Sequence, residues 1–563
     1  MHLNFHRLNR MCPLVATAAL FVAASVNVMG QPGPGDRPQR PRPAGETPPA
    51  EAKAPVTAES GLKQRTEKAH PGWTLMAPIG STNTWLLDLD GKAVHEWPSD
   101  YPPGNAVYLM DDGSLLRTCR TRSGGGFEAG GRGGLLQRID WDGKVTWEYR
   151  LPDGLMMHHD VEPLPNGNIL AIAWRRYSPE EAAAAGYEIR EMPQQRGGRQ
   201  RGPGRRDETP GERWVDGVYE IKPVGANGGE IVWQWNAWDH LVQDTDETKP
   251  NYGKPSDHPE RINVNWSRRG QADWMHTNAI DYNPELDQVA LSVHGFDEIW
   301  IIDHGTTTEE AKGAKGDLLY RWGNPQAWGA GSASDQVLFR QHDVRWIEPG
   351  HPGAGDLMIF NNGDPRKGST IVQITTPIKE DGAYGRKDGV AFGPRSLTWE
   401  FQGSGASAFN SHNISGAERL PNGNTLICSG AEGKLLEVTS DGDVAWAYIN
   451  PFISKRGGGG GPPPNGEGMP DRPRRGDRGM DRPGGPPGDD GQRRGRGRRG
   501  RRGPAEGAPE GGPGRGAPGT GNEVFRVERI GQDHPVAVMI QSKSKPSSPA
   551  DDSKPAAGEE RKQ

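Results

Sequence analysis

The chain has 563 residues, which is enough for several ordinary domains or for one large repeat fold. Only 33% of the residues are hydrophobic, while 81 are glycine and 50 are proline, so strand-like segments must alternate with segments that cannot build a core. The net charge of −6 is too small to indicate nucleic acid or an acidic substrate as a partner.

The first 30 residues resemble an export signal. Basic side chains precede an apolar run over residues 13–29, and small residues follow it. The run is short for a membrane anchor and has no stop-transfer flank, and no later segment could span a bilayer. We therefore expect a cleaved signal peptide over residues 1–30 and a secreted or periplasmic protein. After cleavage two cysteines remain, Cys119 and Cys428. The sequence leaves two alternatives open for them, a disulfide bond or two buried free thiols.

Four segments have compositions that are typical of disorder. Residues 31–68 form a proline-rich tether, residues 193–212 and 455–520 form Gly/Pro/Arg-rich inserts, and residues 541–563 form a tail. An Arg/Gly-rich tract can bind RNA, but acidic residues are interspersed in it, aromatic residues are absent and export is expected. We therefore expect a solvated loop and no nucleic acid, with an anionic polysaccharide as the remaining alternative partner.

The ordered region, residues 69–540, repeats one β-rich unit. A strand with alternating apolar and aromatic residues occurs six times, often directly after a glycine turn: KAVHEW (92–97), KVTWEY (144–149), EIVWQW (230–235), DLLYRW (317–322), SLTWEF (396–401) and DVAWAY (443–448). Another hairpin follows most copies, for example VEPLPNGNILAIA and AERLPNGNTLICS. Four strands repeated six times predict an all-β fold, a six-bladed β-propeller.

The two ends of the ordered region are expected to close the ring. The sixth unit lacks a second hairpin directly after Tyr448, and strand pattern resumes only at NEVFRVERI (522–530). That strand and the early segment GWTLMAPI (72–79) can complete the last blade together. The longest stretch with helical periodicity is a short Ala/Glu segment at residues 179–185.

Histidines recur at one position of the repeat. In four consecutive units a histidine precedes the first hairpin, where a propeller blade begins at the mouth of the channel: His159, His276, His342 and His412. His294 ends the second strand of the unit that His276 begins. Because the repeat superposes these positions, we expect a site with converging imidazoles at the mouth. Such a cluster can bind a metal, act in acid–base or nucleophilic catalysis, or hold an anion.

Three parts of the ordered region carry the most specific patterns: DWMHTNAIDYNPELDQVALSVHGFDEIWIIDHG and GDLLYRWGNP within residues 273–325, FRQHDVRWIEPG and GDLMIFNNGDPR within residues 339–366, and SGAERLPNGNTLICSGAEGKLLEVTSDGDVAWAYINP (415–451). In these segments the chain resembles the arylsulfate sulfotransferase (ASST-like) family of exported six-bladed propellers. The resemblance covers nearly all of the ordered region. It implies transfer of a sulfuryl group from a phenolic sulfate ester to another phenol, through a transiently sulfated histidine and without a cofactor.

The resemblance also implies roles for individual residues. His342, in QHD, would be the nucleophile, and His276 and Asn278, in HxN, would contact sulfuryl oxygens. His159 would help proton transfer to the leaving phenoxide. His294 occupies the position of the family's sulfate-holding arginine, and an imidazole lacks the fixed charge of a guanidinium. Arg345 or Arg366 could compensate, and His412 joins the candidates from the repeat alone.

Three functions therefore stay open at the level of the sequence. The first is an enzyme that transfers a sulfuryl group between a small-molecule aryl sulfate and a phenol. The second is a metal-dependent enzyme acting on an anionic polysaccharide, because His294 adds one more imidazole to the cluster. The third is a non-catalytic propeller that binds ligands at the cell surface.

Overall fold

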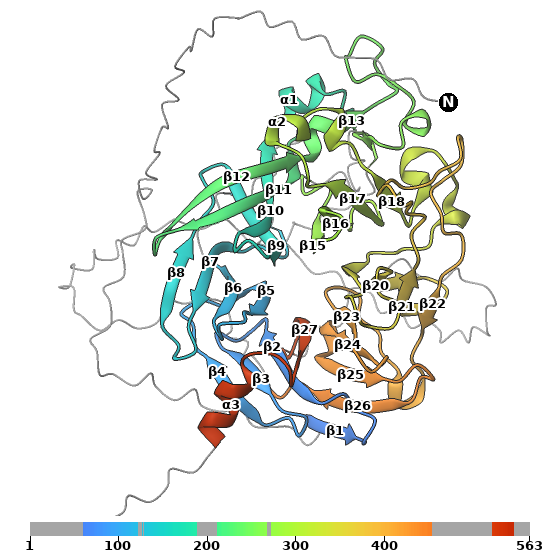
Figure 1. Cartoon of the computed structure of the whole chain (residues 1–563). Coiled ribbons are helices and arrows are strands. Elements are labelled where there is room, and N and C mark those ends of the chain that lie inside the picture. The colour runs from blue at the N-terminus through green and yellow to red at the C-terminus, as the bar shows by residue number, and fades with distance from the viewer. Residues whose placement is uncertain are drawn as a thin grey trace, which may run out of the picture. The chain divides into compact units, whose positions relative to one another are not determined.

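The computed structural model describes residues 60–121, 126–127, 129–188, 211–266, 272–452 and 521–544, and all of them belong to one compact unit. Six antiparallel sheets surround a common centre in this unit (Figure 1). Each sheet has four strands, and one of them carries a fifth strand at its outer edge. The fold is thus a six-bladed β-propeller, and the expected fold class is confirmed.

Blades I to VI follow the order in which their second strands occur along the chain. Each is listed from its inner to its outer strand: blade I (β27, Val524–Gly531; β2, Gly72–Pro78; β3, Thr84–Leu87; β4, Ala93–Trp97), blade II (β5, Pro103–Leu109; β6, Leu115–Arg120; β7, Gly134–Ile139; β8, Val145–Tyr149), blade III (β9, Leu155–Pro163; β10, Ile169–Tyr177; β11, Arg213–Val224; β12, Gly228–Asn236), blade IV (β15, Thr277–Asn283; β16, Gln288–Val293; β17, Glu298–Asp303; β18, Tyr320–Trp322), blade V (β19, His342–Trp346; β20, Leu357–Asp364; β21, Gly368–Ile374; β22, Trp399–Phe401) and blade VI (β23, Gly416–Arg419; β24, Thr425–Ser429; β25, Lys434–Val438; β26, Val444–Ile449).

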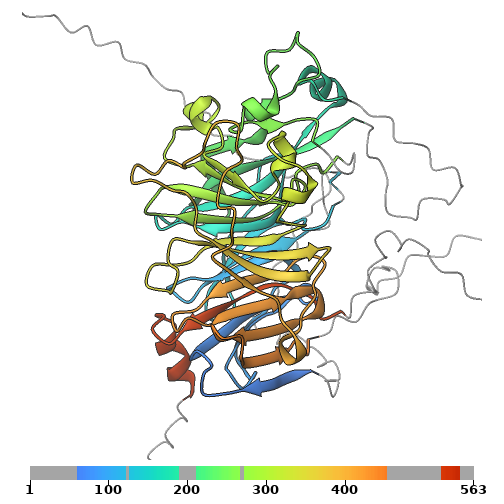
Figure 2. The ribbon, with the colours of Figure 1, turned by 90° about the vertical axis from the view of Figure 1, so that its right-hand side faces the viewer.

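The ring closes where the sequence predicts. Strand β27 pairs with β2, so the C-terminal strand becomes the inner strand of blade I. It lies beside the N-terminal strands in two perpendicular views (Figure 1 and Figure 2). The inner strands contact one another in a closed cycle of β27, β5, β9, β15, β19 and β23. Side chains at the start of these strands are therefore brought to one place.

The fold begins earlier than the sequence indicated. Strand β1 (Gly61–Arg65) pairs with β26 and extends blade VI, although residues 31–68 were expected to be a tether. Its sequence, GLKQR, has a single apolar residue, which is 38% exposed. The strand is held by backbone pairing with an outer edge and not by an apolar face, so periodicity could not reveal it.

The six aromatic strands of the repeat are the fourth strands of the six blades, and they connect neighbouring blades. Indole nitrogens of four blades donate to backbone carbonyl oxygens of the next blade: Trp147 to Gly228 (2.8 Å), Trp235 to Gly316 (2.7 Å), Trp322 to Pro394 (2.9 Å) and Trp446 to Leu89 (2.8 Å). A buried indole N–H needs such a partner. The repeated tryptophan therefore combines burial with an interblade hydrogen bond.

Glycine permits the tight turns that precede three of these strands. Gly91, Gly143 and Gly442 have φ values of +76°, +85° and +87°, in the left-handed region that disfavours residues with a Cβ. Each of their N–H groups donates to the carbonyl of the residue three positions earlier. The Asp-Gly and Gly signals of the sequence thus mark real hairpin turns.

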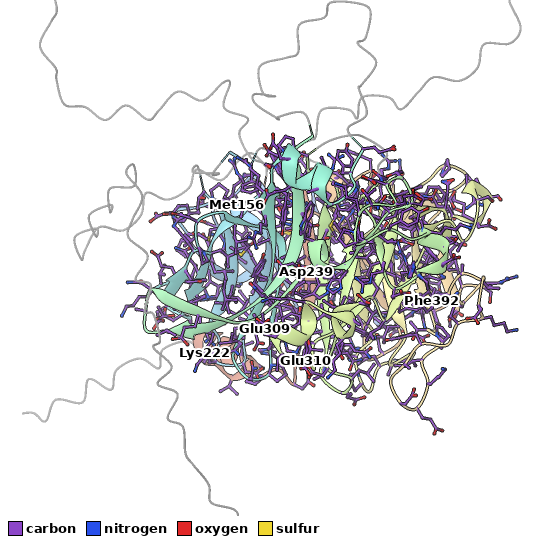
Figure 3. All side chains as sticks on the ribbon, turned by 90° about the horizontal axis from the view of Figure 1, so that it is seen from above. Met156, Lys222, Asp239, Glu309, Glu310 and Phe392 are labelled. Atoms are coloured by element: carbon purple, nitrogen blue, oxygen red, sulfur yellow. The ribbon has the colours of Figure 1, made fainter. Side chains whose placement is uncertain are left out.

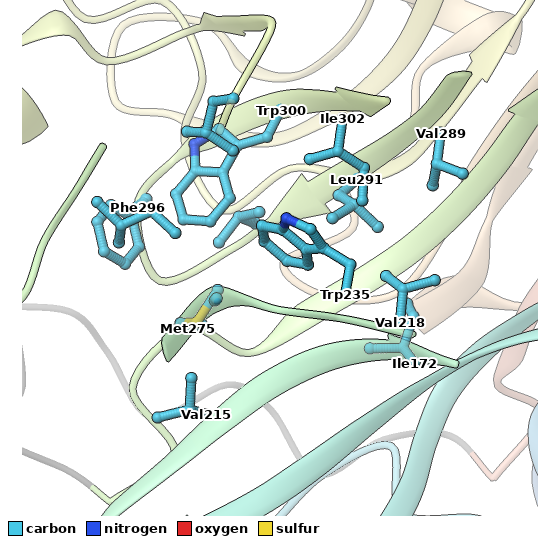
Figure 4. Close-up of a cluster of buried hydrophobic side chains, with 14 of the residues drawn as sticks. Ile172, Val215, Val218, Trp235, Met275, Val289, Leu291, Phe296, Trp300 and Ile302 are labelled. Atoms are coloured by element: carbon cyan, nitrogen blue, oxygen red, sulfur yellow. The ribbon is translucent and has the colours of Figure 1, made fainter. Parts of the chain in front are cut away.

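The hydrophobic core lies between adjacent blades. In the largest cluster, Ile172, Val218 and Trp235 of blade III face Val289, Leu291, Trp300 and Ile302 of blade IV (Figure 4). All of these side chains are at most 1% exposed. Alternate residues of each strand therefore face one neighbouring blade or the other, which is how a propeller buries both faces of its sheets.

Short helices and a small sheet occupy the connections. They are α1 (Pro179–Ala184), α2 (Thr308–Ala311), α3 (Ala537–Ser544), the two parallel strands β13 (Leu241–Val242) and β14 (Ile262–Asn263), and the 3₁₀ helices η1 (Ala237–His240), η2 (Pro255–Asp257), η3 (Ala314–Gly316), η4 (Pro325–Trp328), η5 (Ala333–Asp335), η6 (Gly405–Ser407) and η7 (Gly430–Glu432). Helix α1 coincides with the expected Ala/Glu stretch. Helix α3 runs into the segment that was expected to be a disordered tail.

Several predictions fall outside the described residues. These are the signal peptide (1–30), most of the tether (31–59), most of the first insert (193–210), the second insert (455–520) and most of the tail (545–563). Within the described ranges, no helix is long and apolar enough to cross a membrane. Cys119 and Cys428 are buried and unpaired, so of the two open alternatives the structure has the free thiols.

Candidate active site

The predicted histidines lie at the ends of inner and second strands. His159 belongs to β9, His276 directly precedes β15, His342 begins β19, and His294 directly follows β16. Met156, near the start of β9, and Lys222, near the end of β11, lie on opposite sides of the ring in Figure 3. The face near Met156 is therefore the one on which β9 begins and presents its histidines.

Irregular backbone directs two of these histidines. His159 and His276 both have φ of +51°, and Asn105 at the equivalent place in blade II has φ of +112°. The register of β9 against β10 shifts at this point, as does that of β15 against β16. A left-handed residue other than glycine is uncommon, and a bulge re-aims the side chain that it carries. The shared distortion turns equivalent residues toward the same place.

The structure brings four of the predicted histidines into one row. The ring centroids of His159 and His276 are 4.5 Å apart, those of His276 and His294 are 5.1 Å apart, and those of His294 and His342 are 5.6 Å apart. These residues come from blades III, IV and V. The expectation of converging imidazoles is thus met for four residues, which we call the histidine row.

Hydrogen bonds determine the tautomer of His342. Asn362 donates its amide N–H groups to Ser411 and Ile414 carbonyls, so its oxygen faces His342 Nδ1 at 2.8 Å and accepts the Nδ1 proton. On the other edge, His342 Nε2 accepts the backbone N–H of Ile414 at 3.1 Å. His342 therefore carries its proton on Nδ1 and a lone pair on Nε2.

His276 and His159 are also held through Nδ1. His276 Nδ1 contacts Asp273 Oδ2 in a short hydrogen bond, three residues earlier in the chain. His159 Nδ1 lies 2.9 Å from Nδ1 of the adjacent His158. A polar partner on Nδ1 orients an imidazole and leaves Nε2 for chemistry.

Burial keeps two members of the row neutral. The side chain of His342 is 3% exposed, and burial lowers its pKa to about 4. Burial, followed by the charges of the neighbouring histidines, lowers the pKa of His159 well below the usual range. Both rings are therefore neutral at about pH 7, with one ring proton each, and can act as a nucleophile or a base.

The carboxylates that follow two of these histidines point to neighbouring inner strands. Asp160 accepts the N–H of Ile280 on β15, and Asp343 accepts the N–H of Ala417 on β23. Both also contact Arg526 of β27, whose guanidinium is 2.5 Å from Asp160 and 3.3 Å from Asp343. The two ion pairs connect the inner strands of blades I, III and V, and the two backbone hydrogen bonds add the inner strands of blades IV and VI.

The remaining predicted residues lie outside the row. Asn278 is fully buried, and its amide donates to the carbonyl of Gln341 at 2.8 Å, so it holds the residue before His342. Arg366 pairs with Asp364 at 2.8 Å and is 62% exposed, while Arg345 pairs with Asp343 at 3.0 Å. His412 is exposed on the loop before β23. None of these four contributes to the ring contacts described above.

Arg340 is a cation near the row that was not predicted from the sequence. Arg340 is half-buried with φ of +54°, and its backbone carbonyl faces His342 Nδ1 at 3.1 Å. Its guanidinium lies over Gly363, where a Cβ would come within 2.5 Å of Nη2. Within the described part of the chain, this guanidinium has no hydrogen bond or ion pair. The position of Arg340 two residues before His342, in FRQHD, is the sequence feature that could have identified it.

Other supporting residues were also not predicted. Asp273, Asn362, His158 and Asp216 act through the histidines of the row and not at its surface. Asp273 and His158 lie within three residues of a predicted histidine, and this proximity could have identified them. Asn362 and Asp216 lie on second and third strands, and only the fold brings them close.

The described ranges contain no group of three or more His, Cys, Asp or Glu side chains with a geometry suited to a metal ion.

Comparison with known proteins identifies the family. The fold and the histidine row define a six-bladed propeller with a buried imidazole site at one end. The model of the arylsulfotransferase (ASST) family matches residues 59–190 and 216–445. The chain belongs to the arylsulfotransferase family, and this membership supports aryl sulfotransferase activity in general and small-molecule aryl substrates.

Individual proteins are much less similar. A search of the curated proteins found no match. Among solved structures, a Bacteroides caccae protein of unknown function has 13% identity and a TM-score of 0.36, over 67% of this chain and 93% of that one. Virginiamycin B lyase from Staphylococcus aureus has 13% identity and a TM-score of 0.31, over 69% and 83%. Scores this low support no argument about function.

Proposed function

We propose that this protein transfers a sulfuryl group from an aryl sulfate ester to a phenol, with His342 as the sulfated residue. The observation that carries the proposal is the state of His342. Its Nδ1 proton is held by Asn362, its Nε2 bears a lone pair, and its pKa of about 4 keeps it neutral. These are the properties of a nucleophilic imidazole at neutral pH.

The reaction proceeds in two displacements. In the first, the Nε2 lone pair forms a bond to sulfur while the bond from sulfur to the aryl oxygen breaks, and the phenolate leaves with the electron pair. In the second, an acceptor phenol loses its proton to a base and attacks sulfur, and the N–S bond breaks. A weakly basic imidazole suits the second step because it is a better leaving group.

The hydrogen bond from Ile414 must open for the first displacement. Its N–H occupies the Nε2 lone pair, and Ile414 has φ of +48°, an unfavourable conformation for a β-branched residue. After sulfation the same N–H can face a sulfuryl oxygen. A backbone donor that contacts the anion would stabilise charge that develops in the transition state.

Arg340 is the cation that we assign to the sulfate group. His294 stands where the resemblance places an arginine, and both Arg345 and Arg366 are already paired with carboxylates. Arg340 is half-buried beside His342 and has a guanidinium without a partner in the described residues. A guanidinium can donate two parallel hydrogen bonds to a pair of sulfate oxygens, and it stays charged at every relevant pH.

Acceptor-dependent release of 4-nitrophenol tests the proposal. Purified protein is incubated with 4-nitrophenyl sulfate with and without phenol, beside His342→Ala and beside His412→Ala as the matched control on an exposed histidine. Without phenol we expect a burst of no more than one nitrophenol per protein, and with phenol we expect continued turnover. The first variant should lose both, with a rate lower by at least about a thousandfold, and the control should be unchanged. Continued turnover that does not require phenol, or activity that survives in His342→Ala, contradicts the proposal.

A further inference from the structure

A second buried carboxylate–imidazole pair lies behind His159. His158 is 1% exposed, and its ring stacks on Trp174 with 3.9 Å between centroids and 7° between planes. Its Nε2 lies 3.3 Å from Oδ1 of Asp216, which is itself 3% exposed. Neither of these two atoms has a hydrogen bond in the described residues, so the ion-pair contact at 3.3 Å is the polar contact that the structure gives to each of them.

The surroundings hold this pair in place. Asp216 lies on β11, and its second oxygen accepts the N–H of Thr277 at 2.7 Å. That bond links blade III to the residue after His276. On the other side, His158 Nδ1 faces His159 Nδ1 at 2.9 Å. The result is a continuous series of polar contacts from a buried carboxylate through two imidazoles to the histidine row.

The carboxylate determines where the protons lie. Asp216 is an acceptor, so His158 carries its proton on Nε2 and has a lone pair on Nδ1. His158 Nδ1 then accepts the Nδ1 proton of His159, and His159 has its lone pair on Nε2. This arrangement gives the same tautomer as that of His342, but here it is imposed by a second imidazole and a carboxylate.

We propose that Asp216 and His158 form a proton store that serves His159 from the second displacement of one cycle to the first displacement of the next in the proposed function, on which this inference rests. When the acceptor phenol gives its proton to His159 Nε2, the Nδ1 proton of His159 moves to His158 Nδ1. The positive charge then lies on His158 beside Asp216. In the next cycle the same shifts run in reverse, and His159 Nε2 protonates the leaving phenolate. Each cycle moves one proton in and one out.

The charges around the pair explain why a store is needed. His159 faces His276, His294 and His342, and these neighbours together with burial oppose a proton on it. On the other flank, Arg132 lies along the backbone of His158. Asp216 is the carboxylate next to the pair, and it contacts His158 and not His159. Asp216 and His158 are positioning residues, because neither touches the substrate.

The dependence on the leaving group tests the store. A 4-nitrophenolate leaves without a proton, whereas an unsubstituted phenolate needs one. Asp216→Asn keeps an acceptor for Thr277, and His158→Gln keeps a polar side chain that cannot pass a proton on. We expect each variant to lower the rate with phenyl sulfate by about a hundredfold or more, and to change the burst from 4-nitrophenyl sulfate less than about threefold.

A further measurement excludes a purely structural role. The double variant should be no slower than either single variant, because both interrupt one series of contacts. Equal losses with both donors, or losses that multiply in the double variant, would overturn the inference.

A measurement without substrate separates this inference from the proposed function. Proteins labelled with ¹⁵N-histidine report the tautomer of each ring, and His159→Gln assigns the signal. At alkaline pH, where the store is empty, we expect Nδ1–H for His159 in the wild type and a mixture of tautomers in Asp216→Asn. If wild-type protein releases no nitrophenol but shows this change, the proton store stands and sulfuryl transfer fails. If the tautomer of His159 is the same in both proteins, the store is refuted.

Discussion

Acid should destabilise the wild type more than a variant without the buried imidazole of His342. The pKa of this group is about 4 in the folded protein, against about 6.5 for a histidine in an unfolded chain. Between these values the unfolded chain binds a proton that the folded protein does not bind. The free energy of unfolding therefore falls as the pH falls from about 6.5 to about 4. Below about pH 4 both states bind the proton, and His342 causes no further loss of stability.

The size of the effect follows from the pKa difference. A shift of about 2.5 units at 1.36 kcal/mol per unit gives about 3 kcal/mol in total, of which about 2 kcal/mol is lost between pH 7 and pH 4.5. No reduction for solvent screening applies, because the side chain is 3% exposed. His342→Gln lacks this loss, while His412→Gln, on an exposed loop, keeps it.

Urea unfolding at about pH 7 and about pH 4.5 measures the difference. Other groups titrate in all three proteins, so the comparison between proteins isolates His342. We expect the wild type and His412→Gln to lose about 2 kcal/mol more than His342→Gln. Equal losses in all three would show that His342 is protonated as readily as a solvated histidine, and the reasoning from burial would be refuted.

Three other predictions concern the surroundings of the row. Arg340→Gln should lower kcat for sulfuryl transfer by about a hundredfold, as is usual for a group that stabilises transition-state charge. Arg340→Lys should restore part of this rate, because it restores a positive charge. An unchanged kcat in both variants would show that Arg340 does not belong to the site. Gly131 has φ of +75°, and a Cβ there would lie 2.1 Å from His159 Nε2, whereas a Cβ on Gly130 would come no closer than 3.9 Å to His276. Gly131→Ala should therefore abolish transfer while Gly130→Ala retains it, and similar activity in both would show that His159 can move freely. Cys119 and Cys428 are 0% and 1% exposed, and burial raises the pKa of both thiols. The native protein should therefore resist alkylation and keep its melting temperature in reductant. A lower melting temperature in reductant would indicate a disulfide.

The fold could be predicted because its signals are local and repeated. Each aromatic strand has period-2 alternation, and a glycine turn precedes several of them, so the six copies defined six blades without knowledge of tertiary contacts. The ring closure by residues 522–530 followed from counting strands. Strand β1 could not be predicted in this way, because it is bound through its backbone and has only one apolar side chain.

The site was predictable only where the repeat itself placed a residue. Four histidines at or near one repeat position converge, and the equivalent φ values of His159 and His276 show why. His412, chosen by the same rule, is exposed, because blade VI has its left-handed residues at Ile414 and Ser415 instead. The partners that set protonation, such as Asn362 and Asp216, come from other strands, and no spacing in the sequence indicates them.

The central claim is that His342 carries the sulfuryl group, and trapping the intermediate tests it most directly. The protein is mixed with 4-nitrophenyl sulfate without an acceptor, stopped at alkaline pH, digested, and mapped by mass spectrometry. The account predicts one added SO₃ group on the peptide that contains His342, its loss when phenol is added before the reaction is stopped, and no added group in His342→Ala. An SO₃ group on another residue, or one that persists in His342→Ala, would contradict the account.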